Sequence, residues 1–509
     1  GGSAGPPTGP TGGASPAPTG AGTPKRGGEI KVGLTSDTGN LDPMLSSFLV
    51  DREVFYNLYD SLVAIDSDLK ITPSLAEKWD VSADGKVYTF TLRKDVKYHD
   101  GTDFNADSVK YNIERYLNDK TSRRASEISS IESVTVVDAS TVTFNLKAAF
   151  APLLANLVDR AGMMVSQKAV EAGGADFTRK PLGAGTGPFK FVEWVKDDHI
   201  TLERNPNYWK KGADGQALPY LSKITYRGIT DETVRLTNLK TGDLDADFSV
   251  PAKDLAGIKS GGELAVQETP STSFNSIFFN ISTEPFNKKE FRQAIAYLID
   301  REQIAKTIFF DLQTPGFGPI PPSSWAYDPN FKPYSVDVNK AKELLKAGGK
   351  PDGFTFEMKI GAGSPVMLQL TQLIKDQLAK AGIVMNIVQQ DAAKNGTDTQ
   401  QGNFQCSYYN WSGRIDPDGN IFNQLRGKGS LNESRYDNPQ VNDLLDKART
   451  STDQAERTRL YQEAQKLIVD DAPFVFYSFG LALFITRPAV QNVKVYADQI
   501  MRFEGAWLK

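Results

Sequence analysis

The sequence predicts an α/β protein that is divided into two or three lobes. Three observations support this fold class. The chain has 509 residues, which is too long for a single hydrophobic core. Its first half is rich in stretches of period-two hydrophobicity joined by turn residues, which predict β-hairpins. From about residue 272 onwards, strand-like and helix-like stretches alternate, as is typical of a sheet covered by helices.

The first 28 residues predict a disordered tether. They contain only Gly, Pro and small residues until Lys25, so they have no apolar surface to bury. Such a coil reaches roughly 30 Å. Because no initiating Met and no signal peptide are present, we expect a processed chain that a lipid anchor holds to the membrane surface through its N-terminus. A plain disordered tail or an expression linker is the alternative.

Hairpins dominate the first half. The expected elements are a strand over 27–34, a helix over 48–63, a hairpin that turns at Asp84-Gly85, a helix from 106 that Asn105 or Asp103 caps, a hairpin that turns near 138–140, and a helical stretch over 151–158. The glycine-rich stretch 183–187 precedes a strand, which is the wrong order for binding phosphate. We interpret this stretch as a chain crossing between lobes.

Strands and helices alternate in the second half. The expected elements are strands over 274–280, 354–360, 404–411 and 475–486, and helices over 289–299, 339–348 and 368–382.

Composition excludes several classes of protein. The formal net charge of −4 lacks the basic excess of a nucleic-acid binder. No apolar run reaches about 18 residues, so we expect no transmembrane helix. One cysteine, Cys406, and two histidines, His99 and His199, provide no ligand set for a metal, and we expect neither a metal nor a cofactor. No plausible Ser-His-Asp set is present, so we expect no enzyme. His99 lies in a turn, where we expect it to be hydrogen-bonded.

Several stretches resemble landmarks of one protein family and occur in that family's order. The longest runs from Leu75 to Val109 and contains A-E-K-W, D-G-K-V-Y-T-F-T-L-R and V-K-Y-H-D-G-T-D-F-N-A-D-S-V. Shorter ones are G-T-G-P-F (185–189), N-P-N-Y-W (205–209), P-F-N-K-K-E-F-R-Q-A-I-A-Y-L-I-D-R (285–301) and V-N-K-A-K-E-L-L-K-A-G (338–348). The chain thus resembles family 5, the peptide/nickel class, of the extracytoplasmic solute-binding proteins that serve ABC importers.

This resemblance implies a two-lobed, periplasmic-binding-protein-like fold of the large type with an extra inserted domain. Domain I would comprise 29–55, 180–270 and 484–509, the inserted domain II 56–179, and domain III, the facing lobe, 271–483. Crossings near 270 and 483 would form the hinge. Trp79, Tyr88, Phe90 and Val96 would belong to the core of domain II rather than to the site.

The resemblance also implies a function. The lobes would close over a peptide-like solute and deliver it to a membrane permease. We expect a monomer that binds no nucleic acid and works in the periplasm or at the cell surface. An oligosaccharide or chelated nickel is the alternative ligand within the class, and a hydrolytic enzyme is the remote alternative.

The stretch Y-N-W-S-G-R-I-D-P-D-G, residues 409–419, indicates where the solute binds. Residues 411–416 follow a strand, and ligands of α/β lobes gather at the carboxyl ends of strands. In short-peptide binders of the family, the similar stretch has an aspartate where this chain has Arg414, and that aspartate would pair with the peptide's amino group. A cation here repels an amino group. We therefore expect Arg414 to bind a carboxylate, a phosphate or a peptide carbonyl, or else to pair with Asp416 or Asp418 and stiffen the loop.

The other candidates are chosen by position. Trp411 and Tyr409 would supply a flat apolar wall, two residues follow the first strand, and two follow the crossing near 270. The candidate ligand-binding residues are therefore Trp411, Arg414, Tyr409, Asp416, Ser273, Phe274, Thr38 and Asn40.

Overall fold

A computed structural model describes residues 22–509 of the chain. The tether predicted over 1–28 lies mostly outside the described residues. Its last residues are attached to the rest of the protein: the Arg26 guanidinium donates to the Ala217 carbonyl (2.5 Å), and the Gly27 amide donates to the Tyr220 carbonyl (2.8 Å). The folded part of the protein therefore includes these residues.

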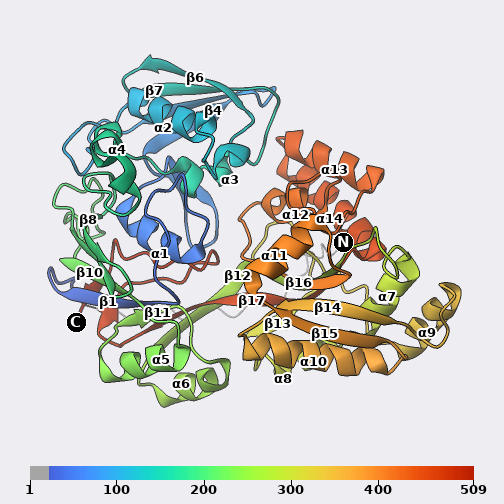
Figure 1. Cartoon of the computed structure of the whole chain (residues 1–509). Helices are drawn as coiled ribbons and strands as arrows, with labels where there is room; N and C mark the ends of the chain where they lie inside the picture. Colours follow the sequence, from blue (N-terminus) through green and yellow to red (C-terminus); the bar gives the residue numbers. More distant parts are fainter. Residues whose placement is uncertain (1–21) are drawn as a thin grey trace, which may run out of the picture.

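One mixed sheet of eleven strands runs through the whole molecule (Figure 1). Ten of its strands form a row in the order β15 (Val384–Gln390), β14 (Thr355–Gly361), β16 (Cys406–Trp411), β12 (Ala265–Phe279), β17 (Phe474–Thr486), β11 (Ala246–Asp247), β1 (Glu29–Leu34), β10 (Lys223–Gly228), β9 (His199–Arg204) and β8 (Phe189–Val195). The eleventh, β13 (Gln313–Pro315), pairs with β17 beside this row. The α/β class predicted from the sequence is confirmed.

The two longest strands, β12 and β17, divide this sheet into two lobes. The first lobe contains the strands from β11 to β8, and the second lobe contains those from β15 to β16. The antiparallel ladder of β12 and β17 is interrupted by a register shift between the pair Pro270–Leu481 and the pair Phe274–Phe479. Proline cannot donate to a ladder, and a register shift breaks its hydrogen bonds. The ladder of β12 and β17 is therefore interrupted between the two lobes.

Residues 183–187 do not cross between the lobes, so that prediction was wrong. Ala184 is packed in the first lobe's core, and β8, which follows, forms the edge of the same lobe's sheet. The segment leads from α4 (Gln167–Gly173) and η3 (Gly174–Thr178) back to that sheet.

The first lobe also contains a separate four-stranded sheet, which lies above the large sheet in Figure 1. Its order is β4 (Ala76–Val81), β5 (Val87–Leu92), β7 (Thr141–Leu146) and β6 (Ile131–Asp138). The neighbouring elements are β2 (Val63–Ile65), β3 (Ile71–Pro73), α2 (Ala106–Asn118), η1 (Ala125–Glu127), α3 (Leu153–Asn156) and η2 (Arg160–Gly162).

The residues that were predicted for the core of domain II do lie in or against the core of this sheet. Tyr88, Phe90 and Val96 are buried, and Trp79 packs against them from the edge. Asn105 caps α2 as predicted: its side chain accepts from the Ser108 amide (3.0 Å). The turn residue His99 is also hydrogen-bonded as predicted, through Nε2 to the Gly187 carbonyl at 3.0 Å.

The first lobe's sheet is covered by short helices. They are α1 (Leu49–Leu58), α5 (Glu232–Thr241), η4 (Ala252–Asp254) and α6 (Leu255–Gly261), and the pair β18 (Val490–Gln491) and β19 (Trp507–Leu508) lies near the C-terminus. Helix α1 ends five residues earlier than the predicted 48–63 because the chain becomes extended at Tyr59 and goes on to form β2.

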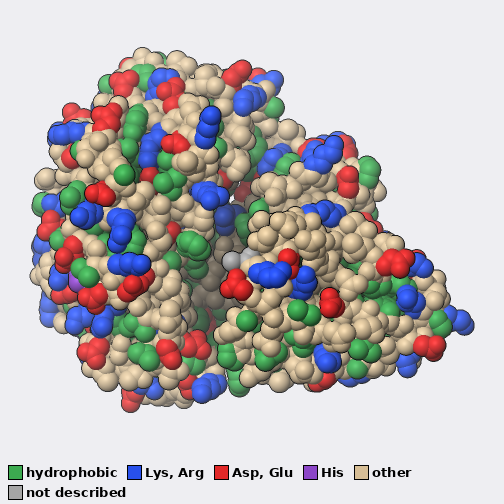
Figure 2. Space-filling view, in the orientation of Figure 1, with side chains coloured by type: hydrophobic (Ala, Val, Ile, Leu, Met, Phe, Trp, Pro, Cys, Tyr) green, Lys and Arg blue, Asp and Glu red, His purple; other side chains and the backbone are tan. Residues whose placement is uncertain are grey.

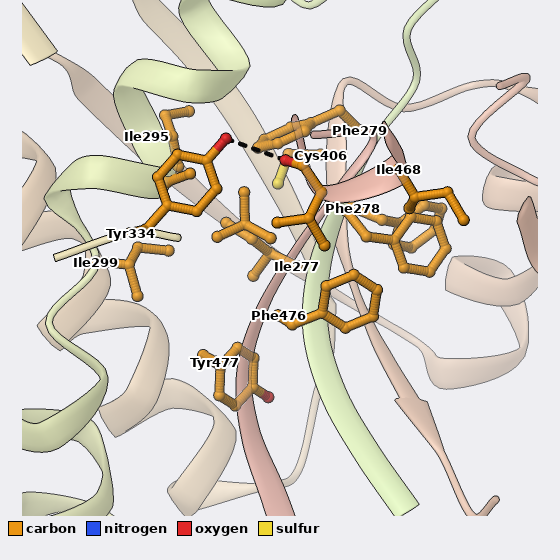
Figure 3. Close-up of a cluster of buried hydrophobic side chains, with 14 of the residues drawn as sticks. Ile277, Phe278, Phe279, Ile295, Ile299, Tyr334, Cys406, Ile468, Phe476 and Tyr477 are labelled. Carbon is orange, nitrogen blue, oxygen red and sulfur yellow. Dashed lines mark hydrogen bonds between the residues drawn. The ribbon is translucent and has the colours of Figure 1, made fainter. Parts of the chain in front are cut away.

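The second lobe has the largest hydrophobic core. Its helices are α7 (Lys289–Leu298), α8 (Arg301–Thr307), α9 (Val338–Ala347), α10 (Pro365–Ala379), α11 (Ala392–Gln401), α12 (Pro417–Leu425), α13 (Pro439–Thr450) and α14 (Gln454–Asp471). Figure 3 shows Ile277 of β12, Phe476 of β17 and Ile295 of α7 in this core, together with Cys406. The Tyr334 hydroxyl donates to the Val469 carbonyl at 3.0 Å. Strands β12, β16 and β17 therefore all contribute to this core.

Glu53 in α1 carries a carboxyl group inside the first lobe. The side chain is fully buried, and its Oε2 accepts from the Met501 amide at 2.9 Å. Burial raises the pKa of Glu53, as does the nearby charge of Asp498, whereas the Met501 hydrogen bond, Arg52 and Arg502 lower it. The net result is a pKa of about 8 instead of an ordinary 4.5. The folded chain therefore keeps a proton that the unfolded chain releases above about pH 4.5.

We predict that the contribution of Glu53 to the stability of the protein falls as the pH rises from about 4.5 through 8, because in this range its carboxyl is protonated in the folded state and ionised in the unfolded state. At about 1.4 kcal/mol per pKa unit, Glu53 accounts for a loss of roughly 3–5 kcal/mol. The variant Glu53→Gln cannot ionise at this position, so its free energy of unfolding lacks this dependence on pH. Urea denaturation at pH 5, 7 and 9 measures it, with the exposed Glu263→Gln as the control. Parallel pH profiles for wild type and Glu53→Gln would contradict the assignment.

Candidate functional site

The loop that leaves β16 holds Arg414 in a fixed position. Gly413 has a φ of 84°, and a Cβ there would lie 1.9 Å from the Thr272 carbonyl, so only glycine fits. The Asn420 side-chain oxygen accepts both from the Arg414 amide (2.8 Å) and from the Trp411 indole (2.9 Å). The Arg414 guanidinium lies 4.8 Å from the centre of the Trp411 ring, which supports it from one side.

Arg414 forms no ion pair with the aspartates of its own loop, so that alternative is wrong. Asp416 accepts from both terminal nitrogens of Arg457 (2.8 and 2.9 Å), and Asp418 accepts from Arg449 (2.8 and 2.9 Å). Both carboxylates are buried and fully engaged. One terminal nitrogen of Arg414 donates to the Gly413 carbonyl (2.7 Å), and its other N–H groups have no acceptor within residues 22–509.

Three further arginines, all from the first lobe, lie near Arg414. Arg52 is on α1, Arg124 precedes η1, and Arg160 begins η2. Arg52 and Arg124 act electrostatically on both Arg414 and Arg160, and Arg414 acts on Arg160. We call Arg52, Arg124, Arg160 and Arg414 the arginine cluster. Three of these residues were missed in the sequence analysis.

Hydrogen bonds hold the first-lobe members of the cluster in place. Asp159 accepts from Arg52 through both oxygens (3.1 and 3.0 Å) and lies 3.8 Å from the Nε of Arg160. Arg124 and Arg160 both donate to the Ser46 carbonyl, at 3.0 and 3.3 Å. Arg124 also forms an ion pair with Glu127 at 2.6 Å. The cluster therefore depends on the loop around Ser46 as well as on its carboxylates.

The arginine cluster carries more positive charge than the carboxylates around it neutralise. Among the described residues, the four guanidinium groups face four carboxylates, those of Asp51, Glu127, Asp159 and Asp498. Asp498 is also paired with a fifth guanidinium, that of Arg502, at 2.6 Å, so five guanidinium groups face four carboxylates. The Nε atoms of Arg124 and Arg160 are buried without a hydrogen-bond partner in this part of the chain. Such unsatisfied donors in a positive environment favour an added anion.

The pKa shifts agree with an excess of positive charge. Burial and the charges of Arg124, Arg52 and Arg414 lower the pKa of Arg160, and Asp159 opposes them. The net result is a pKa of about 10. Burial and the charge of Arg52 likewise lower the pKa of Arg414. Asp159 is buried too, but its arginine neighbours hold its pKa well below the usual range.

The other candidate residues near β16 and the crossing differ in their burial and in their contacts. Trp411 and Tyr409 are half-buried, and their rings stack 6.3 Å apart. Phe274 is fully buried and packs on Tyr409 and Phe476, so it is a core residue and not part of the cleft surface. The Ser273 hydroxyl is hydrogen-bonded to that of Ser271 (2.6 Å) at the crossing between the lobes.

The two residues after the first strand do not join the arginine cluster directly. Thr38 is buried, and its hydroxyl has no hydrogen-bond partner among the described residues. The side-chain oxygen of Asn40 accepts from the Asp42 amide (2.7 Å), which closes its own turn. Both residues belong to the loop that reaches Asp51, whose carboxylate accepts from the Gly39 amide at 2.8 Å.

Cavities separate the lobes beside these residues, and Figure 2 shows that the surface is hollowed between the lobes. A small cavity of about 20 Å³ is lined by Arg52, Asp159 and Arg414, and a larger one of about 780 Å³ lies between the four-stranded sheet and the second lobe. Beyond the larger cavity the lobes touch, since the Ala151 amide donates to the Arg449 carbonyl at 2.8 Å. The two lobes are thus in contact at one end of this cavity.

Fold and site together define a class of protein. Two lobes that are joined by crossing strands and have a cavity between them are the architecture of a binding protein that encloses a dissolved ligand. The model of the family "bacterial extracellular solute-binding proteins, family 5, middle" matches residues 70–433. The chain belongs to this family, as the sequence predicted, and is the substrate-binding component of an ABC importer.

Individual relatives support the same assignment. The glutathione-binding protein GsiB of Pectobacterium atrosepticum is 31% identical over 488 residues, which cover 94% of this chain and 93% of the relative. GsiB of Salmonella choleraesuis is 32% identical over 458 residues, which cover 88% of each chain.

Solved structures share the fold over nearly the whole chain. The periplasmic binding protein DppA from Helicobacter pylori, in complex with the peptide STSA, has a TM-score of 0.81 and 28% identity, with 95% of this chain and 98% of that chain covered. AgaA from A. tumefaciens R10, in complex with agropinic acid, has a TM-score of 0.80 and 29% identity, with 95% and 99% covered. The predicted two-lobed, periplasmic-binding-protein-like fold is confirmed.

Membership of the family also fixes where and how the protein works. Its members are substrate-binding components of transporters that act outside the cytoplasmic membrane, and they are not enzymes. In the described part of the chain, no helix has both the length and the apolar character needed to cross a membrane.

Proposed function

We propose that the protein captures a short, anionic, peptide-like solute between its lobes, and that Arg414 binds a carboxylate of this solute. The observation that carries the proposal is the excess positive charge of the arginine cluster beside the cavity. The ligand carboxylate is the missing counter-charge, and the closed lobes shield it from water. The permease of the importer then receives the peptide unchanged.

The geometry supports this role for Arg414. Its guanidinium lies on the cavity surface, is braced by Trp411 and has free N–H donors within the described residues. Arg124 and Arg160 are more deeply buried and contribute mainly through their charge. A planar guanidinium binds a carboxylate through two parallel hydrogen bonds, which gives both affinity and orientation.

The relatives narrow the class of peptide. Two of them are named for glutathione, an anionic tripeptide with two carboxylates, and AgaA was solved with an acid. The absence of an aspartate at position 414 supports the same choice, because the site lacks the carboxylate that would pair with a peptide's amino group there. The oligosaccharide and chelated-nickel alternatives receive no comparable support from these relatives.

Glutathione is therefore the first probe. We predict that it raises the melting temperature and binds in a calorimeter, whereas its diethyl ester, which has no free carboxylate, and the zwitterion triglycine bind much more weakly. At 100 times its dissociation constant, a ligand adds about 2.7 kcal/mol to the free energy of unfolding. Equal stabilisation by glutathione and its diester, or by a neutral oligosaccharide alone, would overturn the proposal.

The membrane attachment and the domain bounds belong to the same proposal. The Gly- and Pro-rich residues 1–24 support a lipid-anchored tether. The three domains keep the bounds given above, and the protein acts as a monomer. Fractionation of cells that produce the protein from its own gene tests the anchor, because an anchored protein pellets with membranes and is released by detergent.

A further inference from the structure

The larger cavity, of about 780 Å³, has a different character from the arginine cluster. Apolar side chains of the first lobe form one wall, namely Leu69, Ile71, Val81, Tyr88 and Leu154. Trp325 and Ile415 of the second lobe face them across the cavity. Its volume lies in the range of small-molecule sites, which are usually apolar with a few polar groups.

Charge inside this cavity is balanced. The two buried charged residues in its lining, Asp416 and Arg457, are paired with each other, and the Arg457 guanidinium also lies 5.2 Å from the centre of the Trp325 ring. The other two charged lining residues, Asp68 and Lys70, are exposed and of opposite sign. The cavity therefore offers no net charge to a ligand.

One apolar residue in the lining is unusually exposed. Val81, at the end of β4, has 39% of its surface accessible although it belongs to the cavity wall. A ligand that covers Val81 removes this apolar surface from water, which is favourable.

The two cavities are neighbours, since Ala155 and Ile415 line both of them. Ile415 directly follows Arg414 in the chain. A ligand held by its carboxylate at Arg414 therefore reaches the apolar cavity with its next few atoms.

We propose that the apolar cavity is a second subsite, and that it takes an uncharged apolar group carried by the anionic peptide. This inference rests on the proposed function and adds to it the second half of the ligand's chemistry. The preferred solute is then a peptide with carboxylates at one end and a bulky alkyl or aryl substituent, with Trp325 and Val81 in contact with that substituent.

The experiment compares glutathione with S-hexylglutathione, because the thiol allows an alkyl chain to be added without changing either carboxylate. Each fully buried methylene is worth about fourfold in affinity, so we expect S-hexylglutathione to bind at least about tenfold more tightly. Trp325→Ala should remove most of this advantage, and Val81→Ser at least about threefold of it, while neither changes the affinity for glutathione.

Val137→Ser is the matched control. Val137 lies in β6 of the same four-stranded sheet, is exposed, and is not part of the cavity lining. It should leave both affinities unchanged. Because Val81 is on the surface, Val81→Ser folds even if Trp325→Ala does not.

The outcomes separate the two proposals. If both compounds bind equally in the wild type, the subsite is overturned, whereas the anionic-peptide function stands. A hexyl advantage that Val81→Ser and Trp325→Ala leave intact also overturns the subsite, because the chain then lies elsewhere. If neither compound binds, both proposals fail.

Discussion

Replacing Arg414 with alanine is expected to weaken glutathione binding by about 10- to 100-fold. This is the affinity that hydrogen bonds to a charged group usually contribute. The same substitution should not lower the stability of the unliganded protein. Arg414 is desolvated beside the positive charge of Arg52 and has no carboxylate of its own, so its removal relieves repulsion. Calorimetry and the melting temperature without ligand measure the two effects. Arg414→Lys keeps the charge but loses the planar fork, and should bind with intermediate affinity.

Arg426→Ala is a matched control for this experiment. Arg426 also lies against an aromatic ring, that of Phe422 at 5.2 Å, but it is paired with Asp446 and lies outside the arginine cluster. Its loss should leave the affinity unchanged. Equal affinities of Arg414→Ala and wild type would remove Arg414 from the site, and a drop in melting temperature would make it a structural residue.

Replacing Asp416 with alanine is expected to have the largest effect on stability. Its ion pair with Arg457 is buried on both sides, and its carboxylate also accepts from the Asp418 amide at the start of α12 (2.9 Å). Removal of one partner leaves a buried guanidinium without its counter-charge, which costs about 3–5 kcal/mol. Urea denaturation measures the loss.

The exposed pair of Asp443 and Lys447 provides the control for Asp416→Ala. The side chains of Asp443 and Lys447 are 60% and 63% accessible. Asp443→Ala should therefore change stability by about 0.5 kcal/mol or less. A small effect of Asp416→Ala on stability, together with a large loss of ligand affinity, would instead make Asp416 the direct ligand contact that the sequence suggested.

Much of the fold could be predicted because local signals agreed with it. The capping residue Asn105 and the alternation in Val87–Leu92 each specify a local element. The length of β12 could not be predicted in the same way. Its first half, Ala265–Pro270, carries a proline and lies mostly at the surface, and it is a strand only because β17 pairs with it from more than 200 residues away.

The site was predicted only in part. Arg414 could be found because it follows a recognisable strand and breaks a family pattern. Arg52 could not, because charged residues such as Asp51, Arg52 and Glu53 on a short helix usually face solvent, whereas here all three are buried. Arg160 had a weak local signal, an Asp-Arg pair before Gly162, but nothing in the sequence places it near Arg414. Phe274 was misassigned because its position next to the crossing gives no sign of which face of β12 it occupies.

A crystal structure of the protein with glutathione tests the central claim most directly. The account predicts closed lobes, with a ligand carboxylate within hydrogen-bonding distance of the Arg414 guanidinium and the Trp411 ring still behind it. A bound ligand whose carboxylates all lie away from the arginine cluster would contradict the account.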